Sequence, residues 1–182
     1  EHSSRQVQSR WGYAKRLNME LSRKISAEIT KYAVEYQADV IVFEYLEMQG
    51  KISGKKKQKL HLWRKRDIQK LCEHQAHRNR IRVSRVSARN TSRLACDGSG
   101  AVVRNPENHS LCIFQTGKQY NCDLSATYNI GARYFIRELL KPLPETERSS
   151  LEAKVPAVKR RTSCVYADLR KLYVEVNNLK AA

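Results

Sequence analysis

The segment CDLSATYNIGARYFIRELL, residues 122–140, constrains the fold more than any other part of the chain. Its apolar side chains recur at roughly helical spacing: Leu124, Tyr128, Ile130, Ala132, Phe135 and Leu139. Asp123 stands at its start, where the positive end of a helix dipole favours a carboxylate, and Pro142 and Pro144 follow its end. These features predict a helix over 122–140 that opens on an acidic residue.

The run ADVIVFEYLE, residues 38–47, contains the apolar stretch VIVF, which ends at Glu44. A short β-branched run of this kind is typical of a strand that is buried on both faces of a sheet. A carboxylate in such a strand is costly unless it is solvated or paired. Glu44 is therefore either a structural residue, solvated or paired with an arginine, or part of a ligand site at the carboxyl end of a sheet strand.

The remaining segments complete an α/β pattern. Between residues 14 and 36 apolar side chains recur every fourth position, which predicts a long helix with this face against a core: Leu17, Leu21, Ile25, Ile29 and Ala33. Residues 48–59 predict a flexible, lysine-rich loop, 60–80 a basic helix, 81–88 a strand, and about 165–179 a terminal helix. The alternation of helices and strands indicates an α/β fold.

Residues 90–121 are rich in Gly, Asn and Ser and contain the short apolar pieces GAVVRN and SLCIFQTGKQY. This texture predicts a small, hairpin-rich insert with two short strands. The expected organisation is a first core part at 1–89, the insert at 90–121, the last core helix at 122–141, and a basic carboxyl-terminal tail with a helix at 142–182.

The charge of the chain predicts a polyanionic partner. Lys and Arg total 35 against 18 Asp and Glu, a formal net charge of +17, and the segment 51–93 holds 15 of the basic residues against two acidic ones. Nucleic acid is the first candidate partner. The residues expected to contact its backbone are Lys55, Lys56, Lys57, Lys59, Arg64, Arg66 and Arg78.

Two observations bear on the compartment. No stretch approaches the roughly 20 apolar residues that a membrane span requires, so no membrane association is expected. Five cysteines at irregular spacing do not form the pattern of a secreted disulfide scaffold, which favours a reducing cytoplasm.

Asp123 and Glu44 together suggest more than either does alone. Asp123 by itself is explained by helix capping, a common use of aspartate. Two carboxylates, one ending a strand and one starting a helix, could instead converge on divalent metal, where paired Mg²⁺ ions activate a water and stabilise the leaving oxygen of a phosphodiester. Asn129, six residues after Asp123, either faces the same cleft or is an amide on the helix surface.

These motifs resemble those of a known family. ADVIVFEYLE resembles the second catalytic motif of RuvC-like nucleases, YNCDLSATYNIGARYF their third, and ARNTSRLACDGSG the start of the zinc-ribbon region inserted between them. The arrangement is similar to that of transposon-encoded TnpB proteins and the related type V CRISPR effectors, over about residues 15–140. The resemblance implies an RNase H-like (RuvC) core, Mg²⁺-dependent DNA endonuclease activity, and guide RNA and target DNA as partners.

Carried over by position, Glu44 and Asp123 would be the second and third carboxylates that bind Mg²⁺. The family's first aspartate lies on an earlier strand, and this chain has no acidic residue in a strand before Glu20. We therefore expect the chain to be the carboxyl-terminal part of a longer nuclease, with little or no cleavage by the isolated chain.

The insert departs from the zinc-ribbon pattern, because no two of its cysteines form a Cys-x-x-Cys pair. Cys96, Cys112 and Cys122, with His109 as a fourth ligand, could bind Zn²⁺; the alternative is that these thiols are small buried hydrophobes in a ribbon without metal. Arg104 resembles the ribbon's basic residue near the cleaved strand, and is otherwise an ordinary surface arginine.

Two rival functions stay open. A nuclease-dead relative, or a transposition accessory factor, would bind nucleic acid without cutting it, and the missing first aspartate favours that class. A basic RNA-binding protein of ribosomal type would explain the charge but would leave the placement of Glu44 and Asp123 as coincidence.

Overall fold

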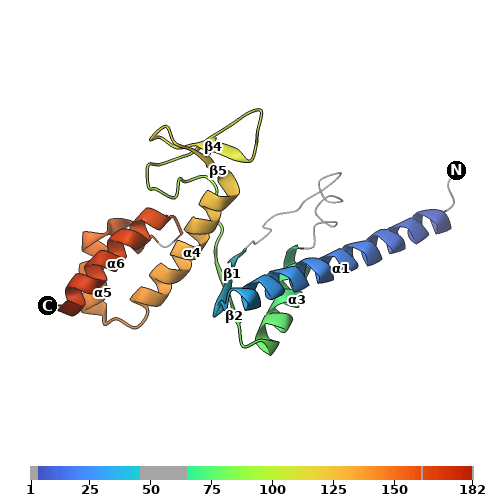
Figure 1. The fold of residues 1–182 in the computed structure, drawn as a ribbon, viewed down its shortest axis with the longest axis horizontal. Helices are drawn as coiled ribbons and strands as arrows, with labels where there is room; N and C mark the ends of the chain where they lie inside the picture. The colour runs from blue at the N-terminus through green and yellow to red at the C-terminus, as the bar shows by residue number, and fades with distance from the viewer. Residues whose placement is uncertain (1–3, 46–64, 161, 182) are drawn as a thin grey trace. The chain divides into compact units, whose positions relative to one another are not determined.

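The computed structural model describes residues 4–45, 65–160 and 162–181 (Figure 1). It divides into two compact units, which are described separately below. The described residues of the first unit are 4–41 and 65–84, and those of the second are 42–45, 85–160 and 162–181. Strands β1 (Val40–Tyr45) and β2 (Arg82–Ser87) are hydrogen-bonded neighbours in a two-stranded sheet. The fold is mixed α/β, as the sequence indicated.

The first unit is built on two helices, α1 (Ser4–Glu35) and α3 (Lys65–Arg78), which lie side by side (Figure 1). Both helices end in the same way. The residue in the left-handed region is Gln37 after α1 and Arg80 after α3, and the next residue's N–H returns to the carbonyl of Ala33 or Ala76. This reversal is a standard helix stop, and it directs the chain into β1 and β2.

The face of α1 that is buried differs from the predicted one. Leu17 and Leu21 are more than half exposed, at 56% and 53%, and Ile25 is 37% exposed. Ala33 is buried as predicted, but the other buried residues lie one position beyond the predicted stripe and carry small hydroxylated side chains: Ser22, Ser26 and Thr30. The prediction that the leucine stripe covers a core is therefore wrong for Leu17, Leu21 and Ile25.

Hydrogen bonds within α1 explain why its hydroxyl stripe can be buried. Ser22 donates to the carbonyl of Asn18, Ser26 to that of Arg23, and Thr30 to that of Ser26, at 2.7, 2.9 and 2.9 Å. The hydroxyls are thus satisfied by their own helix before α3 covers them. Opposite them α3 presents the fully buried Cys72 and Ala76, and short side chains on both helices allow close packing.

The second unit contains the helix predicted over residues 122–140. Helix α4 (Cys122–Leu140) has the predicted bounds, and α5 (Glu145–Lys154), the 3₁₀ turn η1 (Pro156–Lys159) and α6 (Tyr166–Ala181) follow it. The core of these helices comprises mostly large apolar residues: Ile136, Leu140, Leu151, Val155, Val158, Cys164, Leu172 and Val176. The predicted terminal helix is confirmed as α6, whereas α5 was not predicted.

The insert forms a small antiparallel sheet at the amino end of α4 (Figure 1). Its strands, in the order β3 (Val103–Arg104), β4 (Leu111–Ile113) and β5 (Gln119–Asn121), place Cys112 opposite both Arg104 and Tyr120. The sequence predicted two strands here, and the structure has three. The third escaped prediction because each strand is only two or three residues long, too short for a periodic pattern.

Strand β1 is less buried than predicted. Val40 to Glu44 are half-buried and Tyr45 is exposed, so the strand is not enclosed on both faces. Within the described residues its sheet has only two strands, and that leaves much of its surface uncovered. Strand β2, in contrast, lies within the predicted range 81–88.

Part of the predicted basic surface lies outside the described residues: the loop at 48–59 and the individual residues Lys55, Lys56, Lys57, Lys59 and Arg64. Arg66 and Arg78 are described and exposed on α3. None of the described helices is both long enough and apolar enough to cross a membrane.

Candidate functional site

Glu44 is connected to α4 through Thr91. The Thr91 hydroxyl donates a hydrogen bond to the Glu44 carboxylate, although the two residues are far apart in sequence. Glu44 is half-buried near the end of β1, and Thr91 is only 3% exposed. The carboxylate therefore has a fixed hydrogen-bond donor inside the second unit.

Asn129 holds Thr91 in place. This fully buried amide donates from Nδ2 to the carbonyls of Thr91 and Leu94, at 3.0 and 2.8 Å, and its Oδ1 accepts from the backbone N–H of Tyr166 at 3.1 Å. A buried amide with partners for both of its ends is strongly fixed. Of the two interpretations of Asn129, the surface amide is wrong, because the side chain is buried and ties α4 to the 91–94 loop and to the start of α6.

Arg133 is the second buried polar side chain of α4 in this region. Its Nε donates to the carbonyl of Cys164 at 3.1 Å and its Nη1 to that of Ser87 at 2.6 Å, while Nη2 has no hydrogen-bond partner among the described residues. Burial lowers the pKa of the guanidinium, and electrostatic interactions with Cys164 and Glu44 partly oppose that shift. Arg133 thus places a positive charge in the field of Glu44.

Asp123 lies in the exposed first turn of α4. The cap of this helix is Asn121, whose side-chain oxygen accepts from the N–H groups of Asp123 and Leu124 at 3.0 and 2.9 Å. The capping explanation of Asp123 is therefore wrong: its neighbour performs that role. A carboxylate in the first turn still gains from the helix dipole.

The two predicted metal-binding carboxylates belong to one unit, but Glu44 lies on β1 and Asp123 in the first turn of α4. Asn129, which bonds to Thr91, and Arg133, which lies in the field of Glu44, are about 9 and 15 Å along the helix axis from Asp123 at 1.5 Å per residue. In the part of the chain that is described, no group of three or more His, Cys, Asp or Glu could hold a metal ion. Glu44 and Asp123 are hard oxygen donors suited to Mg²⁺, yet they supply only part of a two-metal site.

Cys96, Cys112 and Cys122 gather in one apolar cluster with Ala95 and Phe114. All three are buried free thiols. Burial, together with the nearby Cys122 thiol, raises the pKa of Cys112 to about 11, so this side chain is a neutral thiol at neutral pH. In this cluster the three cysteines pack as small apolar side chains do.

His109 and Arg104, the remaining predicted residues of the insert, lie on its surface. His109 is exposed, and its backbone carbonyl accepts from Arg104 Nη1 at 3.4 Å. Arg104 Nη2 lies equally far from the carbonyl of Ser92. Both contacts are long, so the guanidinium is loosely held in an exposed position.

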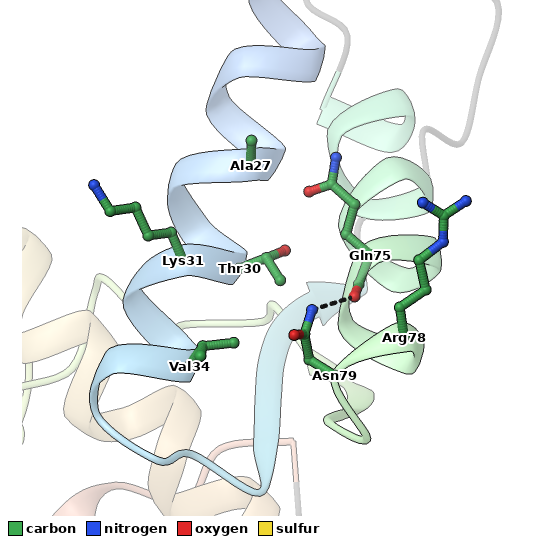
Figure 2. Close-up of a pocket in the computed structure, with 7 residues that line it drawn as sticks. All are labelled: Ala27, Thr30, Lys31, Val34, Gln75, Arg78 and Asn79. Carbon is green, nitrogen blue, oxygen red and sulfur yellow. Dashed lines mark hydrogen bonds between the residues drawn. The ribbon is translucent and has the colours of Figure 1, made fainter.

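A groove between α1 and α3 includes Arg78, one of the two described residues of the predicted basic surface (Figure 2). It has a volume of about 410 Å³ and is lined by Ala27, Thr30, Lys31, Val34, Gln75, Arg78 and Asn79. Lys31 extends outward from α1 and Arg78 outward from α3, so each rim carries one cation (Figure 2). None of these seven residues is acidic.

The sequence analysis missed Thr91, Arg133 and Lys31. The spacing of Asn129 and Arg133, one helical turn apart and flanking Ala132, was a usable signal that polar side chains share the buried face of α4. Thr91 gave no such signal, since its contact with Glu44 depends on tertiary structure.

No protein-family model matches the chain, and no curated protein is significantly similar to it. The functional assignment consequently depends on the residues and contacts described above.

Proposed function

We propose that this chain is the carboxyl-terminal part of an RNA-guided, Mg²⁺-dependent DNA endonuclease with an RNase H-like (RuvC) core, similar to TnpB and the type V effectors. The observation that carries the proposal is the link from Glu44 through Thr91 to Asn129. It joins the strand of one motif to the helix of the other, and these are the two segments on which the resemblance rests.

In this proposal Glu44 and Asp123 would hold Mg²⁺, which when bound supplies an activated water and stabilises the leaving oxygen. Thr91 and Asn129 orient the Glu44 carboxylate, and the buried guanidinium of Arg133 lies in its electrostatic field. Because two carboxylates are an incomplete set, a further carboxylate must come from outside the described residues. The isolated chain is accordingly expected to cut little or not at all.

The exposed stripe Leu17, Leu21 and Ile25 on α1 and the half-buried faces of β1 support the same view. Exposed apolar rows on a helix and a sheet commonly mark surfaces that another element covers. A remaining sheet of a RuvC-like core would cover such surfaces.

The groove of Figure 2 is the proposed contact for a nucleic-acid backbone in the first unit. Cations on both rims suit a phosphate chain that runs between them, and the amides of Gln75 and Asn79 add hydrogen-bond donors. Replacing Lys31 or Arg78 by alanine should weaken RNA and DNA binding whatever the sequence and lower the salt slope of log K by about 1 each. Lys180→Ala, which removes one charge outside the groove, is the matched control.

The decisive experiment is a Mg²⁺ cleavage assay on the complete protein with its RNA. Asp123→Asn and Glu44→Gln should each reduce cleavage at least about 100-fold while RNA binding persists, because a lost metal ligand costs more than the 10–100-fold of an outer-shell change. Glu107→Gln, at an exposed site in the insert, should cut normally. Full cleavage by both site variants would refute the assignment.

A nuclease-dead binding protein is the second candidate, and the contacts of Glu44 favour it. A hydrogen bond from Thr91 and a nearby buried arginine would equally stabilise a Glu44 carboxylate with a purely structural role. RNA binding without cleavage in the wild-type protein and both variants would select this candidate.

A further inference from the structure

Two four-residue turns of the insert have the same geometry. In the first, the N–H of Gly98 donates to the carbonyl of Ala95 at 3.2 Å; in the second, the N–H of Gly117 donates to that of Phe114 at 2.9 Å. Both glycines have φ of 82°, a conformation that other residues rarely adopt. The leading residues of both turns, Ala95 and Phe114, belong to the same buried cluster.

This pair of turns has the spacing of a zinc ribbon but not its ligands. A ribbon binds zinc through paired ligands that are commonly two residues apart, as in Cys-x-x-Cys. The corresponding four positions here are Ala95, Gly98, Phe114 and Gly117, and none of their side chains can ligate a metal.

At one of these four positions a buried aromatic side chain belongs to the cluster. Phe114 is 3% exposed and packs against Tyr120, with ring centroids 5.5 Å apart and an angle of 43° between the ring planes. Cys112 is fully buried in the same cluster, and its Sγ lies 3.4 Å from the carbonyl of Tyr120, to which the thiol donates.

The insert is also fixed to the helices of the second unit by groups other than metal ligands. The N–H of Cys96 donates to Ser125 Oγ of α4 at 3.2 Å, and the N–H of Ala167 of α6 donates to the carbonyl of Cys96 at 3.0 Å. Cys122, the first residue of α4, is itself part of the cluster and directly precedes Asp123.

We propose that the insert is a ribbon that folds without metal, around an apolar core in which Phe114 occupies the place of the zinc ion, and that this core fixes the first turn of α4. The proposal goes beyond the proposed function and does not depend on it: it concerns how the insert is held, whether or not the protein cuts DNA.

The test measures bound metal and thermal unfolding of the wild-type chain. After expression in zinc-supplemented medium and desalting, elemental analysis should find far less than one zinc per chain, and an excess of EDTA should leave Tm unchanged. One equivalent of zinc, or a fall in Tm with EDTA that zinc reverses, would overturn the proposal.

A pair of variants tests the role of Phe114. Phe114→Ala should lower Tm by several degrees equally with and without EDTA, whereas Phe135→Ala, at a 52% exposed site on α4, should change it little. If Phe114→Ala unfolds the chain outright, Phe114→Leu should restore most of the stability. A Phe114→Ala protein as stable as the wild type would show that the apolar core does not hold the insert.

Discussion

The α1–α3 pair and the α4–α5–α6 group pack their helices with different kinds of side chain. In the first, the contact face of α1 is Ser22, Ser26 and Thr30, each bonded to its own helix. In the second, the contact faces carry Leu140, Leu151 and Leu172, all fully buried. Small hydroxylated faces bring helices close but remove little apolar surface from water, so the second group should contribute most of the stability of the chain.

The largest loss of stability is expected when a large buried side chain is removed from the α4–α5–α6 group. Leu172→Ala should lower the free energy of unfolding by about 4 kcal/mol, because it removes buried methyl groups and leaves a cavity. Urea unfolding followed by circular dichroism measures this loss. Val174→Ala, at a 55% exposed site on the same helix, should cost under about 0.5 kcal/mol, and equal effects would contradict the assignment of the core.

Asn129→Leu tests whether the buried hydrogen bonds of the second unit contribute as much to its stability as the buried leucines do. The change leaves the carbonyls of Thr91 and Leu94 and the N–H of Tyr166 without their partner, for an expected loss of about 3 kcal/mol. Asn178→Leu, on the exposed surface of α6, is the control. An unchanged free energy of unfolding for Asn129→Leu would mean that the hydrogen bonds of Asn129 do not stabilise the second unit.

High pH should weaken the second unit through Cys112. Its pKa is raised from 9.0 to about 11, so the stabilising contribution of the neutral thiol is complete below pH 9 and is lost as pH rises through 11. Between about pH 8 and pH 10 the wild type should lose about 1 kcal/mol more than Cys112→Ala. Urea midpoints at the two pH values measure the difference. Equal losses of stability in both proteins would show that ionisation of Cys112 is not the cause.

Ser26→Ala should have the smallest effect. The hydroxyl bonds to its own helix, and alanine favours helices, so the change in free energy of unfolding should stay within about 0.5 kcal/mol. Ser26→Leu should cost about 2 kcal/mol by overpacking against α3. If Ser26→Ala were as costly as Leu172→Ala, the two regions would not differ as described.

The sequence predicted helices better than it predicted their faces. The bounds of α4 followed from Asp123, from helical spacing and from the prolines after Leu140, all of which act locally. The buried stripe of α1 was misassigned because spacing cannot distinguish a leucine row from an adjacent serine row when both repeat every four residues. Which row is buried depends on the side chains of α3, and these lie far away in the sequence.

The candidate site was predictable in part. Glu44 and Asp123 stood out because a carboxylate beside an apolar run, or at a helix start, calls for an explanation. The residues around Glu44 were not predictable, because Thr91 donates to Glu44 and accepts from Asn129 only in the folded chain. The matched turns at Ala95 and Phe114 were not predictable from metal-ligand spacing, because none of their four ligand-equivalent positions is a cysteine.

The cap of α4 has a consequence for how residue 123 can vary. Because Asn121 satisfies the first amide groups of the helix, the identity of the side chain two positions later is nearly irrelevant to whether the helix starts. If Asp123 carries the proposed chemistry, that chemistry and the start of the helix depend on different residues, and a lineage could lose or regain the charge at Asp123 by a single substitution while the surrounding architecture stayed intact.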